Sequence, residues 1–92
     1  MAPQRQSVHV SRPETARGSN ELIARKAERY RFVSRVPMLC ECSDPGCDAI
    51  FLIELDHYRE ASHDGYLTAP GHGVESFQPE RTHDTYWLHT PS

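Results

Sequence analysis

The fold is decided by residues 38–55, which read MLCECSDPGCDAIFLIEL. Side chains of an extended chain point alternately to opposite faces, and the alternation over residues 38–42 predicts a short strand. Residues 49–55 are rich in β-branched and aromatic side chains, which favours a second strand. Between them, residues 43–46 are Ser, Asp, Pro and Gly, all of them turn formers. The stretch therefore predicts a β-hairpin with cysteines at its tip.

The cysteines of this stretch have the spacing Cys40-x-Cys42-x4-Cys47. A tetrahedral zinc ion takes ligands at about 2.0–2.3 Å, and thiolates suit it. Two cysteines one residue apart on a strand share a face, and the turn brings the third back to them. We therefore predict one zinc ion per chain, structural if a fourth protein ligand closes the tetrahedron and catalytic if that position stays open. Buried or free thiols and a redox pair remain as alternatives.

The fourth ligand is sought among the histidines. His72 is preferred because it lies in a Pro-Gly-His turn, whose glycine lets the backbone approach the hairpin closely. His57, on a short predicted helix, is the second choice. Asp44 is a further candidate because carboxylates also ligate zinc. The remaining histidines are expected to be solvated: His9, His63, His83 and His89.

Upstream of the hairpin, residues 1–18 are polar and contain two prolines and a glycine, so they predict a disordered basic arm. A helix is expected from Ser19 or Asn20 to about Arg35, where Pro37 disfavours further helical turns. Its apolar stripe comprises Leu22, Ile23, Ala27, Tyr30 and Val33.

Downstream, Asp56 can cap a short helix that runs to about Ser62, and three strands are expected over residues 66–68, 74–77 and 85–89. The predicted fold is therefore α+β: an N-terminal helix plus a small antiparallel β-sheet with a zinc-bearing hairpin and one short helix. Residues 19–92 would form a single domain. A domain of this size buries little surface, and domains of this kind often use a metal as a staple.

Residues 1–20 contain no apolar stretch of the kind found in a signal peptide, and the longest apolar run, residues 49–53, is too short to cross a bilayer. A cytoplasmic location is therefore expected. Thiols stay reduced there, and clustered cysteines more often hold metal than form disulfides.

Charge divides the chain into two halves. Residues 1–35 carry eight basic and three acidic residues, whereas residues 36–92 carry two basic and ten acidic ones. The basic half could bind an acidic surface of another protein or nucleic acid. Charge asymmetry alone rarely specifies a partner, however, and favours a basic helix that rests on the acidic half of its own chain.

The motifs together resemble a family. The C-E-C-x4-C stretch, a helix with Tyr58, the Tyr66-Leu67-Thr68-Ala69-Pro70-Gly71-His72 segment and the late Tyr86-Trp87-Leu88 strand are similar to those of small, largely uncharacterised bacterial proteins common in actinobacteria. The resemblance covers about residues 20–90. It implies the same metal ligands, Cys40, Cys42, Cys47 and His72, and it implies no activity.

The predicted function is that of a structural-zinc, zinc finger-like protein, a non-enzymatic regulatory or adaptor module that binds another protein. The basic helix, through Arg25, Lys26 and Arg29, is the expected partner surface. The first alternative is nucleic-acid binding through the arm and the helix. A metal store or sensor and a metal-dependent hydrolase are less favoured, and no catalytic residues are assigned. No membrane partner is expected.

Overall fold

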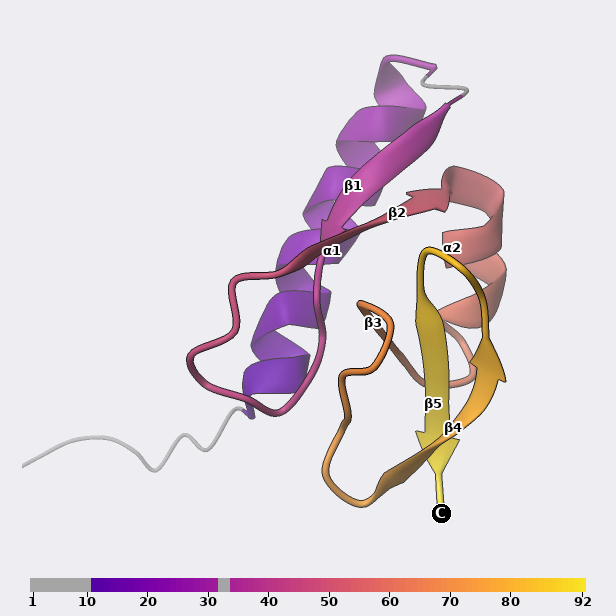
Figure 1. Ribbon diagram of the computed structural model, residues 1–92. Coiled ribbons are helices and arrows are strands. Elements are labelled where there is room, and N and C mark those ends of the chain that lie inside the picture. Colours follow the sequence, from indigo (N-terminus) through magenta and orange to yellow (C-terminus); the bar gives the residue numbers. More distant parts are fainter. Residues whose placement is uncertain (1–10, 32–33) are drawn as a thin grey trace, which may run out of the picture.

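Residues 11–31 and 34–92 are described by the computed structural model (Figure 1). In chain order the elements are α1 (Arg12–Arg29), β1 (Arg35–Leu39), β2 (Ile50–Glu54), α2 (Leu55–Ala61), β3 (Tyr66–Thr68), β4 (Phe77–Thr82) and β5 (Trp87–Pro91). Two antiparallel sheets are present, one of β1 and β2 and one in the order β3-β5-β4. The α+β prediction is confirmed.

The first helix begins earlier than predicted. Residues 12–18 are helical, so their assignment to a disordered arm was wrong, and residues 1–10 of that arm lie outside the described residues. Ser11 and Glu14 form a capping box, in which each residue's side chain accepts the other's backbone N–H. Pro13 lies in the first turn, where its missing N–H would have no helical partner.

The helix also ends earlier, at Arg29 rather than near Arg35. Arg31 has a φ of 54°, in the left-handed region, which the helix cannot continue through. Arg35 already belongs to β1, opposite Glu54 of β2. Pro37 lies inside β1 at a position that does not bond to β2, so its missing N–H costs no bond of the ladder.

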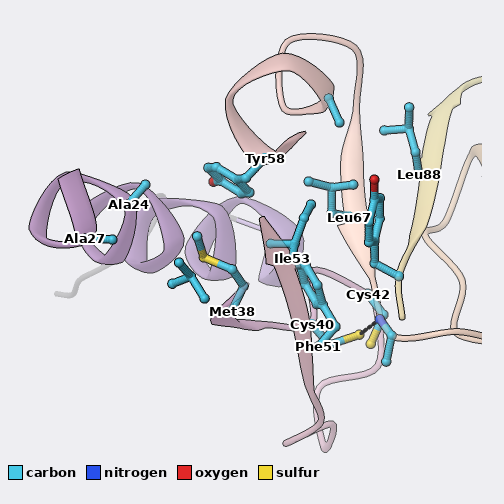
Figure 2. Packing of buried hydrophobic residues seen from close by; sticks show 14 residues of the cluster. Ala24, Ala27, Met38, Cys40, Cys42, Phe51, Ile53, Tyr58, Leu67 and Leu88 are labelled. Atoms are coloured by element: carbon cyan, nitrogen blue, oxygen red, sulfur yellow. Dashed lines mark hydrogen bonds between the residues drawn. The ribbon is translucent and has the colours of Figure 1, made fainter. Parts of the chain in front are cut away.

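The buried face of α1 differs from the predicted stripe. Leu22 and Tyr30 are 62% and 69% exposed, and Val33 lies outside the described residues. The buried side chains are mostly small: Pro13, Ala16, Asn20, Ala24 and Ala27. Small residues let the helix lie close to the hairpin, and Figure 2 shows two of the alanines near Met38 and Tyr58.

Glu41 joins α1 to the hairpin and to β3. Its side chain is fully buried and accepts two hydrogen bonds from Arg17, at 3.0 and 2.8 Å. It also accepts from the Asn20 side chain and from the Leu67 backbone N–H, both at 2.8 Å. Arg17 further donates to two carbonyl oxygens that follow α2. Every oxygen of this buried carboxylate is therefore paired, as a buried charge requires.

The second sheet holds β3 where it was predicted, while β4 and β5 begin later than the strands expected at 74–77 and 85–89. Gly65, just before β3, lies so close to β5 that a Cβ there would come within 1.9 Å of the His89 carbonyl oxygen. No helix among the described residues is both long and apolar enough to cross a membrane.

Candidate metal centre

Four side chains that the sequence predicted as ligands come together at one end of the buried cluster. The donor atoms of Cys40, Cys42, Cys47 and His72 all lie within 4.8 Å of one another. Cys40 and Cys42 are fully buried, and Figure 2 shows both at one end of the packed side chains. Cys47 and His72 are partly exposed. The group can therefore hold a metal ion, with one side towards solvent.

The spacing of the donor atoms fits a tetrahedral ion. The Nδ1 atom of His72 lies 3.4 Å from the Cys40 sulfur and 3.5 Å from the Cys47 sulfur. An ion with bonds of about 2.3 Å to sulfur and 2.0–2.1 Å to nitrogen would separate tetrahedral S and N ligands by about 3.5 Å. Little movement is thus needed for these ligands to close on an ion.

Two turns bring the later ligands into place. Cys47 donates its backbone N–H to the Asp44 carbonyl at 3.1 Å, and the Asp44 carboxylate accepts the Gly46 N–H at 2.9 Å. Asp44 therefore caps the turn and does not belong to the ligand group. His72 follows Gly71, whose φ of 85° lies in the region that favours glycine, and its N–H bonds to the Ala69 carbonyl at 3.2 Å.

The thiols are held by backbone N–H groups. Ala69 donates to the Cys40 sulfur at 3.3 Å, and Ala49 donates to the Cys47 sulfur at 3.4 Å. Burial raises the pKa of the Cys40 thiol to about 12. Burial acts in the same direction on Cys47, but the Ala49 N–H and the neighbouring thiols outweigh it and lower its pKa. A bound ion must displace the Cys40 proton, because the thiolate is the ligand.

Arg12, which the sequence did not single out, holds the cysteine loop from the first turn of α1. Its guanidinium donates to the carbonyl oxygens of Cys40 at 2.6 Å, Cys42 at 2.9 Å and Cys47 at 2.7 Å. One of its nitrogens also lies 3.9 Å from the Cys42 sulfur. Three thiolates around a divalent ion leave one excess negative charge, which this guanidinium is placed to offset.

The other histidines lie elsewhere. His57, the alternative ligand, is outside the cysteine group and contacts Glu54 at 3.3 Å, with Asp56 nearby and all three exposed. His63 and His83 are exposed as expected, and His9 lies outside the described residues. The expectation for His89 was wrong. It is 1% exposed and bonds to the Thr68 hydroxyl at 2.8 Å.

Comparisons with protein-family models, with curated proteins and with solved structures found no match to the chain. The family resemblance stays a prediction. Function is therefore argued from the site and the surface of this chain.

Proposed function

We propose that this chain is a structural-zinc protein that acts as a non-enzymatic adaptor module and binds another protein. The observation that carries the zinc assignment is the group of three sulfurs and one nitrogen within 4.8 Å. Three cysteines and one histidine are a donor set of structural zinc sites, and thiolates favour zinc over magnesium or calcium.

A structural role suits the position of the site. With four protein ligands the tetrahedron has no open position for substrate, which a catalytic zinc requires. The ion would tie the hairpin turn to the turn after β3, which the Ser43 N–H also joins by donating to the Gly73 carbonyl at 3.1 Å. Its binding free energy then contributes directly to folding. A reducing, cytoplasmic compartment would keep the three thiols available.

Elemental analysis tests the zinc assignment. Protein purified without chelator should hold about one zinc per chain, and Cys42→Ser should lose the metal and melt at a lower temperature. His72→Ala should also weaken retention, whereas His57→Ala is the matched control and should retain zinc fully. Folded protein with no zinc and three free thiols would contradict the assignment.

The proposed partner surface is the exposed side of α1 near its C-terminal end. Arg25, Lys26 and Arg29 are exposed and make no ion pair with any described residue. If these cations served to neutralise the acidic half of their own chain, ion pairs would be expected. Tyr30, 69% exposed, lies beside them. Free cations with an exposed aromatic ring suit an acidic protein surface, where they would speed encounter.

Charge reversal tests this surface. The variant Arg25→Glu, Arg29→Glu should lose captured partners in a pulldown, and its melting temperature should not fall. A lower melting temperature with capture intact would refute the assignment. The nucleic-acid alternative is separated by titrating single-stranded oligonucleotides at several salt concentrations. Tight binding that weakens steeply with salt would favour that alternative.

A further inference from the structure

The two edges of the β1–β2 hairpin differ. The edge of β1 is closed, because the Leu39 N–H donates to the Asn20 side-chain oxygen at 2.8 Å and the Asn20 amide donates to the Leu39 carbonyl at 2.8 Å. Further along the same edge, Pro37 has no N–H to offer. A strand from another chain would find little to pair with there.

The edge of β2 is open. The Cys40 N–H donates to the Ala49 carbonyl, so Cys40 and Ala49 form a hydrogen-bonded pair of the ladder. In an antiparallel pair such positions alternate with positions whose N–H and C=O groups point away from the partner strand. Ile50 and Leu52 are the residues of β2 whose backbone N–H and C=O groups point away from β1. Within the described part of the chain neither has a backbone partner, and no strand lies beyond β2.

The side chains next to this edge are apolar. Ile50 is 58% exposed and Leu52 is 44% exposed. In the register of the hairpin they lie opposite Leu39 and Pro37, which are also exposed, so one face of the hairpin is an uncovered apolar surface. Edge strands usually carry a lysine, a proline or a bulge that blocks pairing, and β2 has none of these.

Charge decides which strand fits. Asp48 precedes β2 and Glu54 ends it, and both are exposed. A second copy of β2, paired antiparallel with Ile50 opposite Leu52, would set Asp48 opposite Glu54. Like charges opposed in this way destabilise the pair. A strand with basic ends would instead meet opposite charge at both ends.

We propose that the outer edge of β2 is a docking site for an extended segment of another protein, in which apolar side chains alternate with polar ones and lysine or arginine stands at the ends. Backbone hydrogen bonds would hold the segment and the apolar face would select its side chains. This surface includes neither the cations of α1 nor any of the four proposed metal ligands. The proposal therefore does not rest on the proposed function.

The test uses the full zinc-loaded chain, labelled with 15N, and the capped peptide Lys-Val-Thr-Val-Thr-Val-Lys. Saturable shifts of the Ile50 and Leu52 amide signals are expected. The same peptide with glutamate at both ends should bind at least about tenfold more weakly. Two N-methylated versions of the peptide, each blocking one alternate set of its amides, should differ in affinity, because only one set of amides faces β2 in the bound peptide.

The protein variants are Leu52→Lys, which places a lysine on the open edge, and Leu22→Lys, the control on an exposed leucine of α1. The first should lose peptide binding and the second should keep it. Equal binding of both charge forms or of both N-methylated forms, or no saturable shift, would overturn the proposal. So would dimerisation of the chain alone that Leu52→Lys abolishes, since β2 would then pair with a second copy.

Discussion

Replacing Glu41 by glutamine should destabilise the protein strongly although the two side chains have nearly the same size. Glu41 is fully buried and accepts four hydrogen bonds, two from Arg17 and one each from Asn20 and Leu67. Glutamine has one acceptor oxygen and an NH2 group, which would face other donors. The replacement also leaves the guanidinium of Arg17 without its counter-charge.

Removing one partner of a buried pair costs about 3–5 kcal/mol. The Arg17 side chain is 20% exposed and keeps its bonds to two carbonyl oxygens, so we expect about 2–3 kcal/mol. In a domain of this size, that loss lowers the melting temperature by roughly 10–20 °C. Urea denaturation of the zinc-loaded protein measures it, with zinc content checked in parallel.

Glu28→Gln is the matched control, because Glu28 accepts from Arg59 at 2.9 Å but on the surface. That variant should unfold at the same urea concentration as the wild type. If Glu41→Gln changed the free energy of unfolding by less than about 0.5 kcal/mol, the size of an ordinary surface substitution, the carboxylate would not be holding α1 in place.

Three further outcomes are expected. Gly65→Ala should destabilise the fold by several kcal/mol, since its Cβ would lie 1.9 Å from the His89 carbonyl oxygen. Gly18→Ala, at an open position on α1, should instead stabilise the fold by about 0.5–1 kcal/mol. In thermal melts the first variant should lower the melting temperature and the second should raise it. Arg12→Ala should weaken zinc retention against a chelator by about 10- to 100-fold, and Arg12→Lys should recover only part of that retention. Equal retention in the wild type and both variants would refute the role of the guanidinium. Zinc affinity should fall as the pH is lowered, because the ion displaces a proton from Cys40, whose pKa burial raises to about 12. Calorimetry in two buffers should detect the released proton. A zinc affinity independent of pH would contradict the prediction.

The cysteine loop could be predicted because its signals are local. Alternation predicted a strand over residues 38–42 with Cys40 and Cys42 on one face; β1 ends at Leu39, so both cysteines follow the strand, although their sulfurs lie together. The turn residues before Cys47 indicated a reversal of the chain. The glycine before His72 marked a second tight turn. Each signal spans a few residues, and the structure brings all four side chains together as the sequence indicated.

What the sequence could not predict depends on contacts between distant segments. Arg12 reaches a loop 28 to 35 residues away, and no local pattern distinguishes it from the other arginines. The buried position of His89 follows from the pairing of β5 between two strands. The start of α1 could have been found, since the Ser11 and Glu14 capping box with a proline between them is a recognised N-terminal signature.

The contacts of Arg12 and Arg17 have a consequence for the order of events during synthesis. α1 is made before any of the groups that it binds, and its buried side chains are mostly alanines, which hold a helix only weakly to anything else. Its ion pairs need Glu41 and Arg59, and the carbonyl partners of Arg17 extend to Gly65. The metal group is incomplete until His72 has been added. The first helix of the nascent chain therefore meets its first partners at residues 39–47, and its polar contacts are complete only once the chain has been made as far as Gly65.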